Sequence, residues 1–471
     1  MTKKGLIAVL LALLTALTPV FASAAPNSDY TLVSPYKDVD WSSRKAYKTG
    51  LHTHSSVSDG SETFRNMIYA AYEQNYDILS FSEHGITGRA WDKTPFIRPL
   101  YLYSYLLGYD KKPLTPEEFA AVTDGSAAVG AAGEARGRGM FCLTGSNELN
   151  GVTVTMSHVN GYFLPENVGN MDWGFENGYD YALSLVEKHG GVSHINHPGD
   201  WSGTVWDDKK GEFNTESVDL LTDKLLRYPS CLGVEAVNGF TSVTAHDRVM
   251  WDSLLTRCLP YGKTVFGFAG SDAHTTGRLN SCFMYFMLDE VSNESIRSCM
   301  ERGEFFGATH TVISSGAIGP EQDVHAPEGV DQPLARVSSL TTEGHKITLC
   351  AGNADYVQWI ANGKIIAKQE LSGGKATLDL DTLSTADMLY VRCEIYNVNG
   401  MVFSQPIVID RGSAPLRYEP NIPAAQRVEF ILKSTRVYVI FKALFDLISG
   451  SIKKRDKSKK RRRFQPAAFF I

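Results

Sequence analysis

Short apolar runs alternate with amphipathic helical patterns over the first two thirds of the chain. Residues 61–76, for example, repeat apolar side chains at helical spacing behind Ser61, a residue that can cap a helix. A repeated order of strand and helix favours a parallel sheet, either open or closed into a barrel. The expected strands are 47–54, 77–82, 140–145, 192–196, 233–237 and 264–269. The expected helices are 61–76, a small-residue segment ending near Arg138, 180–189, 220–228 and 243–259.

The pattern changes near Arg336, where short strands separated by Gly and Asn turns replace the strand–helix order. The turn Ala361-Asn362-Gly363 is one such connection. This pattern predicts a small antiparallel sandwich. Its single histidine, His345, precedes the first strand, so we assign this region to packing or binding. The expected strands are 346–350, 356–360, 376–380, 389–396 and 401–409.

The first 24 residues predict an export signal, with cleavage after Ala24. Two lysines begin the segment, an apolar core runs from Gly5 to Val20, and Ala22-Ser23-Ala24 fits a cleavage site. An uncleaved membrane anchor is the alternative. Export would place the protein outside the cytoplasmic membrane. The seven cysteines include no CxxC pair and are odd in number, so a complete disulfide framework is not expected.

The last residues predict attachment to a membrane surface. Residues 437–452 are largely apolar but carry Lys442 and Asp446 near their centre, and each charge would cost roughly 2.5–3.5 kcal/mol in a spanning helix. A helix that lies in the membrane surface keeps both charges in water. Nine of the 46 basic residues and one of the 52 acidic residues follow between Lys453 and Arg463, a composition that suits anionic headgroups.

The rest of the chain is acidic, with 37 basic residues against 51 acidic ones and a formal charge of −14. Such a body is a poor candidate for binding nucleic acid through charge. The oligomeric state is left open by the sequence. We therefore divide the 471 residues as follows: signal peptide 1–24, first domain 27–320, β-sandwich 333–411, linker 412–435, and an amphipathic helix with a polybasic tail 436–471.

Histidines and carboxylates stand at the ends of most expected strands in the first domain. The carboxyl ends of parallel strands gather at one side of a sheet or barrel, where chemistry is usually found. Imidazole and carboxylate ligands without thiolates suit Mn, Fe or Zn and argue against a structural cysteine–zinc site. The residues are His52 and His54, Asp59-Gly60, Glu83-His84, Glu148, His158, His197-Pro198, and Asp272-x-His274.

In this order and spacing, the motifs resemble the PHP (polymerase and histidinol phosphatase) superfamily. The sandwich ending in Phe403-Ser404-Gln405-Pro406-Ile407 further resembles exported metallohydrolases of the CehA/McbA type. The resemblance implies an α/β fold, a distorted seven-stranded (β/α) barrel, followed by a small all-β immunoglobulin-like sandwich.

The resemblance also implies two to three divalent metal ions per chain. His52, His54, Glu148 and Asp272 would hold one ion, and Glu148, His158 and His197 a second, with Glu148 as the bridge. Asp59, His84 and His274 would hold the third. Glu148, His197 and Asp272 are the expected catalytic residues. Glu83 is a candidate partner of one of the ligands.

We predict an exported metal-dependent hydrolase that activates water against a phosphoester of a small molecule. The motif has an aspartate, Asp59, where other members of the superfamily have a histidine, and in this respect it resembles the small-phosphoester hydrolases of the superfamily. The alternatives are hydrolysis of a non-phosphate ester or carbamate, and a metal-binding protein without turnover.

Arg278 and His194 are candidate substrate-binding residues. His194 could instead line the barrel or bind metal. An aromatic insertion that includes Trp91, Phe96 and Tyr101 could be a lid over the substrate or part of the core.

Overall fold

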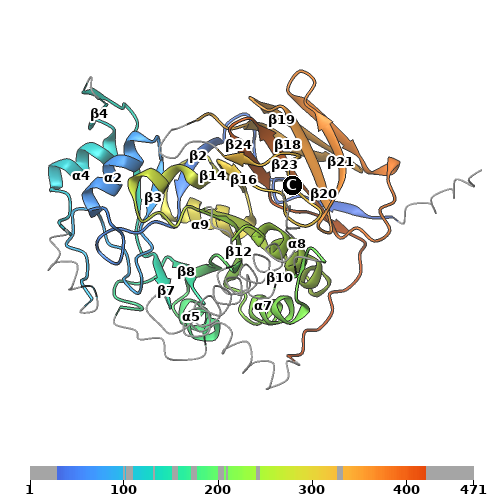
Figure 1. Cartoon of the computed structure of the whole chain (residues 1–471), viewed down its shortest axis with the longest axis horizontal. Helices are drawn as coiled ribbons and strands as arrows, with labels where there is room; N and C mark the ends of the chain where they lie inside the picture. Colours follow the sequence, from blue (N-terminus) through green and yellow to red (C-terminus); the bar gives the residue numbers. More distant parts are fainter. Residues whose placement is uncertain are drawn as a thin grey trace, which may run out of the picture.

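The computed structural model describes residues 29–98, 101, 110–130, 133–150, 157–170, 178–199, 206–207, 210–239, 244–325 and 332–420. Within these ranges the fold is mixed α/β, with many strands and few helices (Figure 1). The predicted signal peptide, the aromatic residues 102–109 and the predicted C-terminal helix lie outside the described residues.

One sheet passes through the first domain with β2 at its middle. On one side of β2 (Lys45–Gly50), the strands β3 (Ile78–Ser80) and β6 (Phe141–Leu143) run parallel to it. On the other side, β14 (Cys282–Leu288) is antiparallel to β2, and β15 (Phe305–Thr309) is antiparallel to β14. The expected strand–helix–strand unit around residues 47–82 is therefore present, with strands shorter than expected.

A second sheet has the strand order β13–β12–β9–β8–β7. The pairs β9–β12 and β12–β13 are parallel, whereas β8 is antiparallel to both of its neighbours. Only nine residues connect β7 to β8, which is too short for the crossover that parallel pairing requires. The expectation of a parallel sheet thus holds for part of the domain. The strands are β7 (Asn147–Leu149), β8 (Val159–Tyr162), β9 (Val192–Ile195), β12 (Cys231–Asn238) and β13 (Phe266–Gly270).

The two sheets meet at the carboxyl ends of their strands through two isolated parallel bridges. Thr53, beyond β2, pairs with Ala273 beyond β13, and His84, beyond β3, pairs with Glu148 in β7. The N–H of His54 donates to the carbonyl of Ala273 over 2.9 Å. Residues that lie far apart in the sequence are joined at these bridges.

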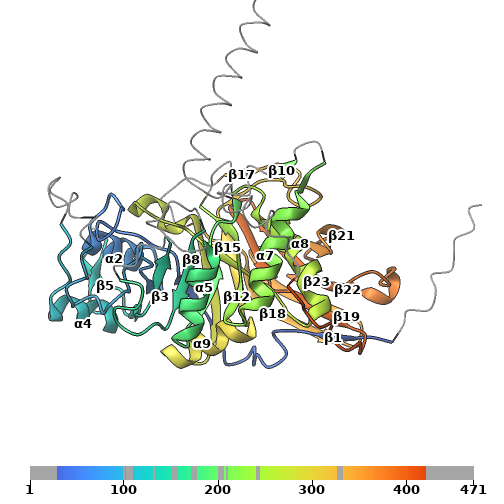
Figure 2. The same ribbon diagram turned by 90° about the horizontal axis from the view of Figure 1, so that it is seen from below.

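Helices cover the outer faces of the sheets. Three of them, α5 (Tyr179–Lys188), α7 (Thr215–Arg227) and α8 (Asp247–Cys258), lie side by side over the second sheet (Figure 2). The helix α9 (Asn293–Arg302) connects β14 to β15. Short elements complete this domain: β10 (Trp206–Asp207), β11 (Glu212–Phe213), β16 (Thr311–Val312), β17 (Val324–His325), and the 3₁₀ turns Leu259–Tyr261 and Thr276–Ser281.

Several helix boundaries differ from the sequence-based expectation, and α7 and α8 begin at Thr215 and Asp247 rather than at 220 and 243. The helix α2 (Phe64–Glu73) is capped by Thr63, whose side chain accepts from the N–H of Asn66, and not by Ser61. Ser61 instead donates to the carbonyl of His274. The small-residue helix α4 (Pro116–Asp124) ends well before Arg138 because Gly125 takes a left-handed conformation with φ 87°. The strands β4 (Ala128–Val129) and β5 (Glu134–Ala135) follow it.

The C-terminal strands are all antiparallel, as expected, and one of their sheets continues into the first domain. Strand β24 pairs with β15, and β1 (Thr31–Val33) pairs with β25. The expected strand 401–409 is interrupted at Pro406, which has no N–H for a ladder. The strands are β18 (Arg336–Glu343), β19 (Lys346–Gly352), β20 (Tyr356–Ala361), β21 (Lys364–Glu370), β22 (Lys375–Asp379), β23 (Tyr390–Asn397), β24 (Gly400–Ser404) and β25 (Ile407–Asp410), with a 3₁₀ turn at Leu380–Thr382.

Buried ion pairs also join the C-terminal strands to the first domain. Arg248 of α8 contacts Glu394 of β23 over 2.7 Å, and Asp252 of α8 contacts Arg392 of β23 over 2.5 Å. Arg392 also contacts Glu394 over 2.8 Å, so the four charges form one cluster. All four side chains are buried, which makes the junction a continuous part of the interior.

Residues 412–420, the first part of the predicted linker, lie against the first domain. The N–H of Leu416 donates to the carbonyl of Pro260, and the hydroxyl of Tyr418 donates to Asp223 of α7 over 2.7 Å. Among the described residues, no helix has the length and apolar character needed to cross a membrane.

Candidate metal centre

His52 and His54 lie just beyond β2, where the two sheets meet, and both side chains are buried. The Nδ1 atom of His52 lies 2.7 Å from Oε1 of Glu235. This contact orients the ring so that the other nitrogen, Nε2, faces the cluster. Nε2 lies 3.2 Å from Asp272 Oδ1 and 3.4 Å from Glu148 Oε1. His54 Nε2 lies 3.2 Å from the same Asp272 oxygen and 3.1 Å from Glu148 Oε2. These four side chains, His52, His54, Glu148 and Asp272, are one group of potential ligands.

Glu148 belongs to a second group on its other side. His158 Nδ1 lies 3.0 Å and His197 Nε2 3.2 Å from Glu148 Oε1. His84 Nδ1 lies 2.8 Å from Glu148 Oε2. The residues expected at the second ion are therefore together, and His84 joins them. Glu148 stands between the two groups, as a bridging ligand would.

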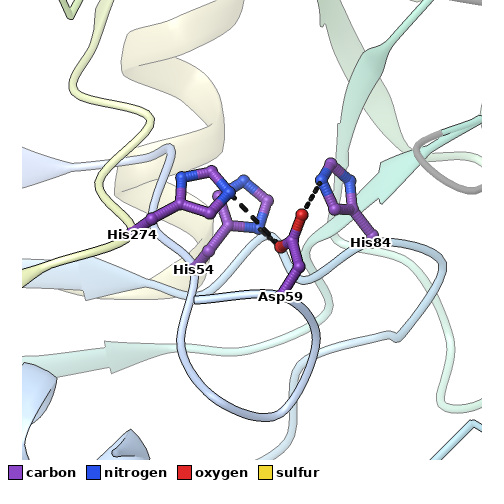
Figure 3. A group of neighbouring side chains, drawn as sticks. All are labelled: His54, Asp59, His84 and His274. Atoms are coloured by element: carbon purple, nitrogen blue, oxygen red, sulfur yellow. Dashed lines mark ion pairs between the residues drawn. The ribbon is translucent and has the colours of Figure 1, made fainter. Parts of the chain in front are cut away.

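A third group surrounds Asp59 and faces solvent. Figure 3 shows the carboxylate of Asp59 between His84 and the pair His54 and His274. One oxygen lies 3.3 Å from His274 Nε2, and the other lies 3.3 Å from His84 Nε2. The side chains of Asp59 and His274 are 35% and 34% exposed, whereas those of His52, His54 and Glu148 are fully buried. We call His54, Asp59, His84 and His274 the outer group, and His52, His54, Glu148 and Asp272 the inner group.

The donor atoms fit divalent ions. Ligand atoms about 2.0–2.2 Å from an ion are roughly 3.0–3.5 Å from one another, and the distances above fall close to that range. Several of these buried atoms, among them His54 Nε2 and Glu148 Oε2, make no hydrogen bond of normal geometry. His274 has its Nδ1 2.9 Å from the carbonyl of Asp272, which leaves Nε2 for the cluster. Such outer contacts orient histidines that bind metals.

The electrostatics of the cluster favours bound positive charge. Burial alone would lower the pKa of His84, but the carboxylates of Asp59 and Glu148 raise it to about 10. Burial is likewise outweighed at His274, where Asp59 and Asp272 raise the pKa to about 9. The pKa of Glu148 lies well below its usual range, because the surrounding imidazoles outweigh its burial. Carboxylates that hold protons on nearby histidines attract divalent ions in the same way, and a bound ion displaces those protons.

Two of the expected ligands have an unusual backbone. His197 has φ 23° and Asp272 has φ 46°, in the region that favours glycine. Strained residues of this kind concentrate at functional sites, where the surrounding structure holds them. The N–H of His197 donates to Glu235 Oε2 over 2.9 Å, which helps to hold this conformation.

Glu235 and Asn196 are site residues that the sequence analysis missed. Glu235 is fully buried in β12 and contacts His52, His197 and the side-chain amide of Asn238. The side-chain amide of Asn196 donates to Glu148 Oε1 over 2.8 Å. A signal for Glu235 was available, because a carboxylate inside the apolar run Cys231–Val237 must find a partner once it is buried.

The candidate substrate-binding residues and the aromatic insertion lie in different parts of the first domain. His194 is buried, stacks on Phe268 with ring centroids 4.3 Å apart and has Nε2 3.6 Å from Glu235, so it lines the interior. It belongs to none of the ligand groups found among the described residues. Arg278 lies on the 3₁₀ turn after His274. Trp91 and Tyr101 are buried in a hydrophobic core. Of the two alternatives for the aromatic insertion, a lid or a part of the core, these two residues agree with the second.

Comparisons with known proteins give structural neighbours only. No model of a protein family matches the chain, and no curated protein matches it. A two-domain protein from Bacteroides vulgatus containing a predicted PHP-like metal-dependent phosphoesterase is similar at 15% identity and a TM-score of 0.37, over 81% of this chain and 99% of that one.

Two further structures are similar over 55% of this chain. The lesion-specific endonuclease PfuEndoQ from Pyrococcus furiosus has 15% identity and a TM-score of 0.31, over 56% of its own chain. A protein from Bifidobacterium adolescentis assigned as a metal-dependent phosphoesterase has 14% identity and a TM-score of 0.26, over 96% of its chain.

Proposed function

We propose that this protein is a metal-dependent hydrolase that acts on phosphoesters of small molecules. The observation that carries the proposal is the convergence of six histidines and three carboxylates, with no thiolate, into adjoining groups, two of which share Glu148. The chemistry that divalent ions supply in such a site is activation of water and stabilisation of negative charge on the ester.

The charge of the site supports an anionic substrate. Three divalent ions would outweigh the carboxylates of Asp59, Glu148, Asp272 and the neighbouring Glu235 by two positive charges, whereas two ions would only balance them. A site with surplus positive charge favours the charge that develops when a phosphoester is attacked. The outer group, which is open to solvent through Asp59 and His274, is where a substrate would approach.

The proposal extends to the fold and the location of the protein. The bridges Thr53–Ala273 and His84–Glu148 support one distorted seven-stranded barrel formed from both sheets, and the strands after Arg336 support an immunoglobulin-like sandwich. The apolar start of the sequence supports export, and the basic end supports contact with a membrane surface. The acidic body argues against nucleic acid as a partner.

The test combines metal analysis with a panel of substrates. Purified protein should contain at least two equivalents of Mn, Fe or Zn, and it should hydrolyse phosphoesters faster than carboxylic esters or carbamates. Preference for the latter esters would favour the first alternative, and full metal content without turnover would favour a binding protein. Protein that binds none of these ions contradicts the proposal.

Glu148→Gln is the first variant to make, because it keeps the side-chain volume and removes the charge that two groups share. We expect the loss of at least one metal equivalent and of nearly all activity. Glu73→Gln, at an exposed carboxylate on α2, is the matched control and should behave as wild type. Wild-type metal content and turnover in Glu148→Gln would show that this residue is not a bridge.

A further inference from the structure

The loop from His54 to Gly60, which carries Asp59, is held from one side by Glu83. The hydroxyls of Ser55 and Ser58 both donate to the carboxylate of Glu83, and the N–H of Ser58 donates to its Oε2 over 3.1 Å. Glu83 is buried beneath this loop. Its contacts fasten the loop backbone, so Glu83 supports the position of Asp59 through the chain rather than through an imidazole.

The other side of the loop is held by the segment that returns from the aromatic insertion. The ammonium of Lys111 donates to the carbonyls of Ser56 and Val57, and the hydroxyl of Ser56 donates to the carbonyl of Asp110 over 2.6 Å. Lys111 is only 2% exposed. Hydrogen bonds from a buried cation are stronger than those between neutral groups. Lys111 therefore joins the insertion to the loop that presents Asp59.

The outgoing segment of the insertion contacts the second ligand loop. Arg98 is buried, and its Nη1 donates to the carbonyl of His84 over 3.4 Å. Gly85 follows with φ 62°, and a side chain there would collide with the guanidinium of Arg98. Arg98 and Lys111, one at each end of the insertion, thus contact the backbone of the loops that carry His84 and Asp59.

The inner group is supported by different parts of the chain. Glu235 of β12 orients His52, and Asn196, directly after β9, donates to Glu148. Neither support comes from the insertion. A change at Lys111 should consequently affect Asp59 before it affects the inner group.

From this division of contacts we infer that Lys111, assisted by Arg98, is a positioning residue through which the insertion sets the metal affinity of the outer group. The inference rests on the proposed function, since it assumes that the cluster binds ions. Loss of an outer contact that orients metal ligands typically weakens binding by 10–100-fold. We expect a weakening in that range at the outer group and a change of less than about twofold at the inner group.

The experiment measures metal binding directly, by titration of Mn²⁺ or Zn²⁺ into the metal-free full-length protein. Lys111→Met should lose affinity in one class of sites and match Asp59→Asn, not Asp272→Asn. Lys111→Arg, which keeps a cation, should recover part of the affinity. Lys112→Met is the control, because Lys112 is 80% exposed beside Lys111 and should bind ions as wild type.

Ser56→Ala removes a single contact between the loop and the insertion. It replaces Lys111→Met in the titration if Lys111→Met does not fold. It should weaken the same class of sites by a smaller factor. The inference is overturned if a folded Lys111→Met variant binds metal with wild-type affinity. The same holds for Ser56→Ala where that variant replaces Lys111→Met. Equal weakening at both groups also overturns it. Wild-type protein that binds no ion contradicts the proposed function instead, so the two failures are distinguishable.

Discussion

At the scale of single residues, the cluster depends on carboxylates with different tasks. Glu148 contacts imidazoles on both sides, whereas Glu235 contacts the far side of His52, the backbone of His197 and the side chains of Asn238 and His194. Burial alone would raise the pKa of Glu235, but His52 and His194 hold it well below its usual range. Glu235 is therefore charged and fixes which nitrogen of His52 faces the cluster.

Glu235→Gln tests this orienting role without removing a ligand. We expect metal affinity to fall by about 10–100-fold at the inner group, because His52 loses the charged partner that fixes its orientation. Titration of the metal-free protein measures the change, and Glu187→Gln, at an exposed carboxylate on α5, is the control. Unchanged affinity would show that Glu235 serves packing only.

Asp59 and Asp272 should respond differently to the same substitution. Asp59→Asn removes a charge from the solvent-facing outer group, and Asp272→Asn removes one from the buried inner group. We expect the two variants to differ in metal stoichiometry and in the ion that restores activity. Titrations with Mn, Fe and Zn provide the measurement, and identical curves for both variants would point to a single, simpler site.

At the scale of elements, the junction between α8 and β23 holds four buried charged side chains in one cluster. Arg248 and Arg392 outweigh the effect of burial and lower the pKa of Glu394 to about 2. A carboxylate with a lowered pKa adds stability above its unfolded value, near 4.5, and that stability is lost as the pH falls toward 2. The junction should therefore hold through mild acid.

Glu394→Gln is expected to destabilise the protein by about 3–5 kcal/mol at pH 7, because two buried arginines lose a partner. The difference from wild type should shrink as the pH falls from about 4.5 toward 2, which denaturant unfolding at several pH values measures. Glu301→Gln, at an exposed pair with Arg297, is the control and should cost no more than about 0.5 kcal/mol. A difference that stays constant down to pH 2.5 would contradict this account.

At the scale of the whole molecule, residues 412–420 determine where the predicted tail leaves the protein. They contact Pro260, just before β13, and Asp223 near the end of the helix that precedes β12. These contacts lie at the end of the domain where β12 and β13 begin, and the cluster lies where they end. Leu416 and Tyr418 thus lie on the side opposite the metal centre.

We expect the tail to bind the membrane surface rather than to span it, because Lys442 and Asp446 then stay in water. Washing membranes with about 1 M salt, where the screening length is roughly 3 Å, should release the full-length protein. An alkaline wash should release it as well. Retention through both washes would indicate a spanning helix, and deletion of the residues after Val428 should abolish binding in either case.

Much of the local structure could be predicted from the chain because its signals are short-range. The apolar spacing of 61–76 and the runs before His84 and Asp272 depend on near neighbours, and the corresponding helix and strands are present. Boundaries were less predictable, since Thr63 and Ser61 are both suitable caps and only the contact with His274 separates them. The candidate ligands were predictable as residue types at strand ends, whereas their grouping followed only from the resemblance to a family.

Sequence alone determined which residues have the chemistry of metal ligands, where most of the described helices and about half of the described strands lie, and that the C-terminal strands differ in pattern. The tertiary structure decided that Glu148 meets His52 and His158 together, that β15 pairs with β24, and that Lys111 reaches the loop of Asp59. The physical reason is distance along the chain. Local periodicity is encoded within a few residues, whereas these contacts join segments whose approach depends on how two whole sheets pack.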